Sequence, residues 1–445
     1  MQLSYMAVLE DGIKPTSVVI DTGKGTIESV TPALSIENES LILFPGFIDI
    51  HVHAREFPKP DPRNKSLFEK WQTICLKETF ETAGRAAING GVTCFAAMPN
   101  DPVPPDNELR FRQKSLLTKN SQCPVVLFAS VTLTSEPWEN LPYKVYLDTH
   151  SSQSGFSSWS DLEEVLRRYR GQRVFFHAED PRVLIDHNSF SEHWKRRPPE
   201  AEVSAVERIL ELTNKFGLVS HICHISTKSA VEAVTSYNKH STVNVTTEVT
   251  PHHLFFSVDE GGYSADGRRI KIDPYILNCN PPIRSEENRQ YMVEALRSGE
   301  IQVLASDHAP HLLSEKITGA PGMPHLDTLG PFVGWLTHNC DFNYQRIAQI
   351  LSSEPIRILS PALASNIGSI KEGFRASFTL LDLNMKTIIR EKNNPTGNLD
   401  LFTRCGWSPF QNISLPAHVI KTIVGGESLD HCLKFDQTDS SPCSD

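Results

Sequence analysis

The chain has 445 residues, of which 39% are apolar, and a formal net charge of -10 at pH 7. This acidic balance argues against nucleic-acid and anionic-membrane partners, which need a basic excess, and favours a small-molecule partner. The nine cysteines are scattered without a CxxC pair, which predicts reduced thiols in a cytoplasmic protein. The N-terminal "MQLSYMAVLEDG" does not resemble a signal peptide, and no apolar run approaches the roughly 20 residues of a membrane span.

Eight β-branched or aromatic runs recur between residues 44 and 311, with helix-like segments such as "SDLEEVLRRYR" between several of them. In chain order the runs are "FPGFIDIHVH", "GGVTCFAAMPN", "CPVVLFASVTL", "YKVYLD", "RVFFHAED", "LVSHICHIS", "STVNVTTEVTPHH" and "IQVLASDHAPH". This alternation predicts a parallel α/β fold, and eight units match a (β/α)8 TIM-type barrel, with a doubly wound sheet as the competing architecture. Most runs end in His, Asn, Asp or Lys, which favours the barrel because barrel enzymes place their chemistry at the C-terminal strand ends.

The two ends of the chain differ from this pattern, since they contain short alternating strands and turns. We predict that residues 1–43 and 365–436 together form a small β-sandwich domain beside a catalytic barrel at 44–364. The polar residues 437–445, "QTDSSPCSD", are expected to be disordered.

His51 and His53 stand two residues apart in "LFPGFIDIHVHARE". Side chains on one face of a strand recur every second residue, so both rings can reach one ion. Taken alone, the pair could equally be packed or exposed histidines. Three later runs carry His177, His224 and Asp307 at comparable positions, and this recurrence favours a shared metal site.

Four imidazoles and one carboxylate suit Zn²⁺ or a similar borderline ion better than calcium or magnesium. They exceed the three protein ligands of one open catalytic site, so we expect two ions about 3.5–4 Å apart with a bridging anion. Lys144, in "LPYKVYLDTH", is the candidate bridge. A buried lysine of lowered pKa can take up carbon dioxide, and the carbamate offers one oxygen to each metal. An exposed lysine with a solvated head is the alternative.

The order HxH, Lys, His, His, Asp resembles the amidohydrolase superfamily, and the surrounding segments resemble the dihydroorotase family. The resemblance is to the group that includes many bacterial enzymes and the dihydroorotase domain of the animal multifunctional pyrimidine protein. The matching segments, within residues 41–335, are "PGFIDIHVHARE", "KETFETAGRAAINGGVTCFAAMPN", "KVYL", "HAED", "HICHISTKSA", "VTTEVTPHHLFFS", "NCNPPIRSEENR", "ASDHAPH" and "GAPGMPHLDT".

This resemblance implies a hydrolase of cyclic amides that interconverts N-carbamoyl-L-aspartate and L-dihydroorotate in pyrimidine (UMP) biosynthesis. The implied ligands are His51, His53 and Asp307 for the more buried metal, His177 and His224 for the second, and carboxylated Lys144 as the bridge. Asp307 would also be the general acid and base. By contrast, His221 is expected to point to the other strand face as a packing residue, and His252 and His253 are given no ligand role.

Both reactants keep a free carboxylate, which requires charge-assisted donors when it is buried. Arg55 follows His53 on the same strand face, and Asn100 and His311 match the family's other carboxylate contacts. The alternatives are that Arg55 is a charge at the rim of the site, Asn100 a turn residue and His311 a solvated loop histidine. The resemblance further implies that Asn280 and the backbone of residues 320–323 hold the ring.

Two departures from the family pattern concern the mouth of the site. Residues 57–76 form an insertion, and Thr149 is out of step with a substrate-covering loop in relatives, so we assign it no role. The rival activities are those of dihydropyrimidinase, hydantoinase and allantoinase, whose substrates lack a free carboxylate. A catalytically inactive partner of an aspartate transcarbamoylase is the alternative from another class. The macromolecular partners we consider are a second copy of the chain and that transcarbamoylase.

Overall fold

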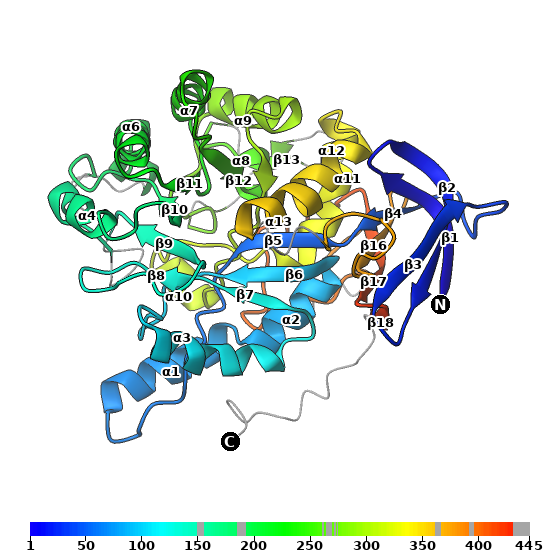
Figure 1. Ribbon diagram of the computed structural model, residues 1–445, viewed down its shortest axis with the longest axis horizontal. Helices are drawn as coiled ribbons and strands as arrows, with labels where there is room; N and C mark the ends of the chain where they lie inside the picture. Colours follow the sequence, from blue (N-terminus) through cyan, green and yellow to red (C-terminus); the bar gives the residue numbers. More distant parts are fainter. Residues whose placement is uncertain are drawn as a thin grey trace.

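The computed structural model describes residues 1–148, 155–184, 193–259, 262–263, 269–270, 273, 275–360, 366–390 and 396–429 (Figure 1). The residues of the predicted C-terminal tail and Thr149 lie outside these ranges. The strands are β1 (Gln2–Leu9), β2 (Gly12–Asp21), β3 (Thr26–Pro32), β4 (Leu41–Pro45), β5 (Phe47–Val52), β6 (Val92–Ala97), β7 (Val125–Leu127), β8 (Ala129–Ser130), β9 (Pro142–Tyr146), β10 (Arg173–His177), β11 (Val219–Ile222), β12 (Thr246–Val249), β13 (Gly262–Tyr263), β14 (Arg269–Ile270), β15 (Val303–Leu304), β16 (Phe378–Asp382), β17 (His418–Val424) and β18 (Glu427–Leu429). The α-helices are α1 (Lys65–Lys77), α2 (Phe80–Asn89), α3 (Glu108–Leu117), α4 (Trp159–Leu166), α5 (His193–Arg196), α6 (Pro199–Phe216), α7 (Lys228–His240), α8 (Pro251–Phe255), α9 (Glu286–Ser298), α10 (Leu313–Ile317), α11 (Leu329–Asn339), α12 (Tyr344–Ala348) and α13 (Glu354–Leu359).

Each of the eight predicted runs contains a strand of a parallel sheet, which confirms the parallel α/β fold. One sheet has the order β5-β6-β7, and the other has the order β15-β12-β11-β10-β9-β8. The chain passes from the first sheet to the second between β7 and β8. At the other edge, a parallel bridge joins Val52, at the end of β5, to His308, which follows β15. Interior side chains between the strands form an apolar layer that includes Ile50, Phe128 and Phe175.

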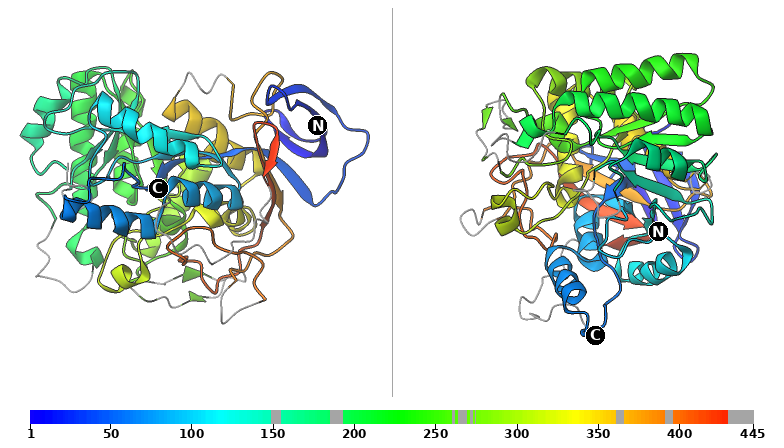
Figure 2. Two further views of the ribbon diagram at one scale, coloured as in Figure 1. Left: turned by 90° about the horizontal axis from the view of Figure 1, so that it is seen from below. Right: turned by 90° about the vertical axis from the view of Figure 1, so that its left-hand side faces the viewer.

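Helices cover the outer face of the larger sheet, and α6 and α7 lie side by side there (Figures 1 and 2). The α6 helix shows why these segments are helical. It begins at Pro199, whose fixed φ suits a first turn, and it stops at Gly217, which adopts a left-handed φ of 61°. Its buried side chains, among them Ala205, Ile209 and Leu212, recur at helical spacing and face the sheet.

The two chain ends build one seven-stranded sheet with the order β18-β17-β16-β4-β1-β2-β3. This sheet lies to one side of the parallel strands (Figure 1). The strand β4 pairs with β1 in parallel and with β16 in antiparallel, so it joins the N-terminal and C-terminal parts. Because β4 spans residues 41–45, the predicted boundary at residue 43 falls inside a strand.

Gly90 fixes the packing of α2 against the segment that precedes α11. A Cβ atom at Gly90 would lie 1.7 Å from the backbone oxygen of Leu326, and the Gly90 oxygen accepts a 2.8 Å hydrogen bond from the Gly330 amide. We therefore expect Gly90→Ala to lower the free energy of unfolding by about 3 kcal/mol, because the new methyl group would clash with backbone atoms, which cannot move aside as a flexible side chain can. Urea unfolding would measure this, with the exposed Gly23→Ala as control; equal midpoints for both variants would contradict the expectation.

Within the described ranges, none of the helices combines the length and the hydropathy needed to cross a membrane.

Candidate functional site

A pocket of about 280 Å³ opens where the parallel strands end. All of the predicted site residues except Lys144 line it: His51, His53, Arg55, Asn100, His177, His224, Asn280, Asp307 and His311. They come from β5, β10 and the segments that follow β5, β6, β11 and β15, except for Asn280, which lies between β14 and α9. Parallel strands bring their C-terminal ends to one edge, and this explains how residues so far apart in sequence meet.

The first histidine pair and Asp307 form one ligand group. The Asp307 Oδ1 atom lies 3.0 Å from His53 Nε2 and 3.3 Å from His51 Nε2, and all three side chains are buried. Burial would raise the pKa of Asp307, but the two histidines outweigh it and lower that pKa to about 2. Burial lowers the pKa of His53 to about 4, so this ring is neutral at pH 7 and can serve as a ligand.

His177 and His224 form the second group. The His177 Nδ1 and His224 Nε2 atoms lie 3.0 Å apart, and the His224 Nδ1 atom has no hydrogen-bond partner among the described residues. The other ring nitrogen of His177 lies 3.0 Å from Glu179 Oε2. Histidine ligands in metal sites commonly donate their second N–H to a carboxylate in this way. Two facing imidazole nitrogens backed by a carboxylate therefore suit a metal ion.

Lys144 lies in β9 below the pocket and is fully buried, so the alternative of an exposed lysine is wrong. Its Nζ donates to Cys223 Sγ over 2.8 Å and stands 5.2 Å from the ring centre of Tyr146, which does line the pocket. The positive charge of Lys144 acts on both His51 and His224, where it adds to the effect of burial in disfavouring the protonated ring. No acidic partner for Lys144 occurs in the part of the chain that the structure describes.

Glu248 orients the first histidine and was not predicted. One of its carboxylate oxygens bonds His51 Nδ1, and this leaves Nε2 to face Asp307. Burial opposes the charge on His51, but Glu248 and Asp307 raise the pKa of that ring to about 10. The two carboxylates therefore concentrate negative charge around His51, as a cation site requires, and a metal ion would take the place of the proton on its Nε2 atom. The signal in the sequence was an acidic residue inside the β-branched run "VNVTTEVT".

The expected orientation of His221 is wrong. Its Nε2 lies 3.1 Å from the second Glu248 oxygen and its Nδ1 lies 2.8 Å from Thr246 Oγ1, so the ring faces the same interior as the site. Strand alternation relates His221 to His224 only if the strand continues between them. The strand β11 ends at Ile222, and His224 adopts a left-handed φ of 37°, which returns its ring to the same side.

Backbone strain marks the site. Arg55, His224 and Asp307 are three of the five non-glycine residues with positive φ in the described chain, at 55°, 37° and 44°. Such conformations cost about 1–3 kcal/mol each and persist where the surroundings enforce them. Each strained residue follows a parallel strand, so the strain turns its side chain toward the pocket.

Arg55, Asn100 and His311 lie at one side of the pocket. Arg55 donates to the Pro310 oxygen over 3.1 Å, and the Trp407 indole donates to the His311 oxygen over 2.7 Å. Burial lowers the pKa of His311 to about 3, so the ring is a neutral donor. The Asn100 Oδ1 atom lies 2.7 Å from His53 Nδ1, so this oxygen is engaged by the first histidine group.

Asn280 is half-buried at the pocket wall and contacts His193. Its Oδ1 lies 2.8 Å from His193 Nε2, and the same ring nitrogen lies 2.9 Å from the Cys279 oxygen. Nearby, His253 Nε2 lies 3.1 Å from the Pro281 oxygen and His252 Nδ1 lies 3.0 Å from His325 Nε2. The ligand atoms of His252, His253 and Cys279 also lie within 4.8 Å of one another, so the absence of a ligand role for the two histidines stays a prediction.

Sequence reasoning missed three polar residues that line the pocket: Lys77, Asp101 and Tyr146. Two of them could have been found from their position in the sequence. Asp101 directly follows the predicted site residue Asn100 in "AAMPND", and Lys77 is the first residue of the family segment "KETFETAG". Asp101 forms a buried ion pair with Lys114, which neutralises its charge.

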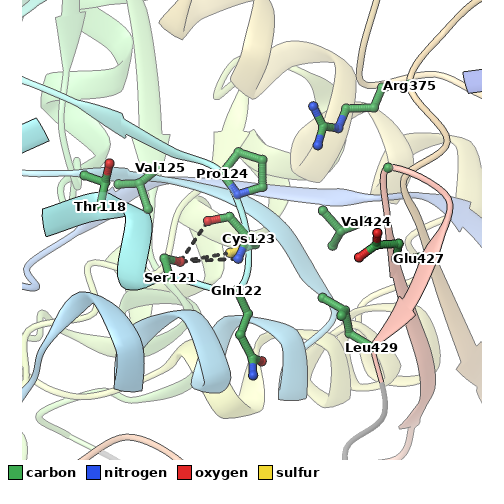
Figure 3. Close-up of a pocket in the computed structure, with 11 residues that line it drawn as sticks. Thr118, Ser121, Gln122, Cys123, Pro124, Val125, Arg375, Val424, Glu427 and Leu429 are labelled. Atoms are coloured by element: carbon green, nitrogen blue, oxygen red, sulfur yellow. Dashed lines mark hydrogen bonds between the residues drawn. The ribbon is translucent and has the colours of Figure 1, made fainter. Parts of the chain in front are cut away.

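A second cavity of about 470 Å³ lies between residues 118–125 and the β17–β18 hairpin (Figure 3). Ser121 Oγ donates to the Cys123 oxygen over 2.8 Å at its wall, and Arg375 and Glu427 stand at its edge. The predicted site residues line the first pocket and none of them lines this one. The smaller pocket is therefore the candidate functional site.

Among solved structures, the chain resembles an L-hydantoinase (dihydropyrimidinase) from Arthrobacter aurescens, with a TM-score of 0.79, 20% identity, and coverage of 96% of this chain and 94% of that one. The fold is therefore the one shared by the cyclic amidohydrolases. Among known sequences, the dihydroorotase of Pyrococcus furiosus is 30% identical over 386 residues, which cover 87% of this chain and 81% of the relative. The dihydroorotase of Pyrococcus horikoshii is 31% identical over 394 residues, which cover 88% and 82%.

The chain belongs to the dihydroorotase family, as its motifs predicted. No protein-family model matches it.

Proposed function

We propose that the chain is a dihydroorotase, which reversibly cyclises N-carbamoyl-L-aspartate to L-dihydroorotate and water in pyrimidine (UMP) biosynthesis. The observation that carries this proposal is one pocket that joins a histidine–aspartate ligand set to a half-buried arginine, Arg55. The relatives that bear this name match most of the chain.

The ligand set fits two divalent ions. His51, His53 and Asp307 would hold one ion, and His177 and His224 would hold the other, because the ligand atoms of each group converge. The second ring nitrogens of His51, His53 and His177 are backed by Glu248, Asn100 and Glu179 respectively. Carboxylated Lys144 is the proposed bridge, and Zn²⁺ is the proposed metal. When bound, such ions lower the pKa of a water between them and polarise the amide carbonyl.

Asp307 is the proposed general acid and base. Its lowered pKa, about 2, keeps it a carboxylate at neutral pH, so it can accept a proton from the attacking water during ring opening. It would return that proton to the ring nitrogen as the carbon–nitrogen bond breaks. Cyclisation would use the same group in reverse.

Arg55 is the proposed anchor of the free carboxylate, since a guanidinium offers two parallel donors to a carboxylate. Asn100, through its amide N–H groups, and His311, through its neutral ring, would complete the contact. Asn280 and the backbone of residues 320–323 are the proposed contacts to the ring, and two of those loop residues, Pro321 and Gly322, line the pocket.

Ring opening of dihydroorotate, dihydrouracil, hydantoin and allantoin by the purified, metal-loaded protein tests the function. We expect turnover of dihydroorotate to exceed that of the uncharged rings by at least about 100-fold, because an uncharged ring would cover Arg55 without supplying an anion, which costs several kcal/mol. Turnover of the uncharged rings but not of dihydroorotate would identify a dihydropyrimidinase, hydantoinase or allantoinase instead. The absence of any turnover would favour an inactive partner protein.

Finer features of the fold and assembly are also part of this proposal. We infer that the two parallel sheets belong to one closed (β/α)8 barrel, supported by the Val52–His308 bridge and a 3.1 Å hydrogen bond from the Phe128 amide to the Ala97 oxygen. A β-sandwich of the chain ends and the domain limits 1–43, 44–364 and 365–436 are proposed from the strand pattern of the sequence, and a cytoplasmic location from its scattered cysteines. A homodimer and association with an aspartate transcarbamoylase are also proposed.

A further inference from the structure

Lys77 is a charged residue of the pocket that the proposed mechanism does not use. It is the last residue of α1, the helix that the insertion 57–76 contributes, and it lines the pocket together with Arg55 and His311. Its side chain is only 14% exposed, and its Nζ lies 2.7 Å from Glu315 Oε1. A buried lysine beside an arginine is electrostatically unfavourable unless an anion compensates for it.

Glu315, in α10, fixes this lysine and the neighbouring histidine at once. Its Oε2 accepts a 2.9 Å hydrogen bond from the Leu312 amide and lies 3.6 Å from His311 Nδ1. Burial would raise the pKa of Glu315, but His311 and Lys77 lower it to about 2, so it is ionised at neutral pH. The carboxylate therefore ties the end of the insertion helix to the segment that follows Asp307.

The charges at this end of the pocket leave one positive charge uncompensated. Asp307 also acts on Arg55, but its charge is assigned to the metal-ligand set. Of the remaining groups, Arg55 and Lys77 are cations, Glu315 is an anion, and the His311 ring is neutral. Asp101 is balanced by Lys114. Burial lowers the pKa of Lys77 and Arg55 lowers it further, which shows that the two cations share one poorly solvated region. One bound carboxylate would neutralise that region.

We propose that Lys77 is a specificity-determining residue of this pocket, held in place by Glu315, and that it selects ring substrates carrying one free carboxylate. Glu315 is a positioning residue that acts through Lys77 and His311. This inference rests on the proposed function and extends it, since the carboxylate is the feature that separates dihydroorotate from the uncharged rings.

The test compares the steady-state kinetics of dihydroorotate opening for the metal-loaded wild type and for Lys77→Met, Lys77→Gln and Lys77→Arg. We expect KM to rise about tenfold in the Met and Gln variants, the equivalent of about 1.4 kcal/mol of lost attraction, while kcat stays within about twofold. Lys77→Arg should restore most of the affinity because it keeps the charge. The inhibition constant of dihydrouracil, which lacks a carboxylate, should not change in any variant.

Lys215→Met is the matched control. Lys215, on the exposed surface of α6, forms an ion pair with Glu163, and this pair joins two helices as the Lys77–Glu315 pair does. This substitution should leave KM unchanged. An unchanged KM in both Lys77→Met and Lys77→Gln would overturn the role of Lys77, and so would a rise that is equally large in Lys77→Arg. A wild type that does not open dihydroorotate would instead overturn the proposed function.

Discussion

Replacing Asp307 by Asn should lower kcat for dihydroorotate opening by about 1000-fold, within the range that a positioned general acid and base contributes. The amide keeps the size of the side chain but cannot accept the proton. Asparagine also tolerates the left-handed backbone at this position, where φ is 44°, so the fold should survive. Single-turnover and steady-state kinetics at neutral pH would measure the effect.

A matched control for this substitution exists in the same chain. Asp341 also has a left-handed backbone, with a φ of 56°, but it is exposed and remote from the pocket lining. Asp341→Asn should leave kcat unchanged. If Asp307→Asn kept wild-type kcat with its metal content intact, the assignment of proton transfer to Asp307 would be wrong.

Replacing Lys144 by Ala should remove bound metal and activity together. We expect the metal content to fall from about two ions per chain to below one, because the bridge that holds the pair is lost, and kcat to fall at least about 1000-fold. Metal analysis by mass spectrometry and ring-opening assays would measure the two effects. Lys144→Met, which fills most of the same volume, separates loss of the amine from creation of a cavity.

Lys316 provides the control for burial. It is as buried as Lys144, and its Nζ donates to the backbone oxygens of Asn278 and Ala320 over 2.7 and 2.9 Å. Lys316→Met should therefore keep both metal equivalents. Full metal content in Lys144→Ala would show that another group bridges the ions.

The strand ends could be predicted because the signals are local. A buried parallel strand appears as a short apolar run, and a polar residue that closes such a run interrupts the pattern, as His177 and Asp307 do. Sheet order and the seven-stranded pairing of both chain ends through β4 depend on contacts between distant segments. The sequence of residues 41–45 therefore did not indicate that β4 pairs with both β1 and β16.

The residues that support the site were harder to predict. Glu248 and Lys77 act through partners that lie far away in sequence, at His51 and Glu315. The orientation of His221 could not be predicted either, because alternation fails where His224 enters the left-handed region. Such backbone strain is imposed by surrounding packing, which leaves no regular spacing in the sequence.

The sequence alone determined the class of fold, the family and the residues expected to bind metal and carboxylate, because these depend on residue type, order and short-range spacing. The tertiary structure decided which nitrogen of each histidine faces the site, the burial of Lys144 beside Cys223, and the pairing of Lys77 with Glu315. These properties arise from electrostatic and packing contacts between segments that only folding brings together. The protein's specificity for a carboxylate is proposed to depend on the last of them.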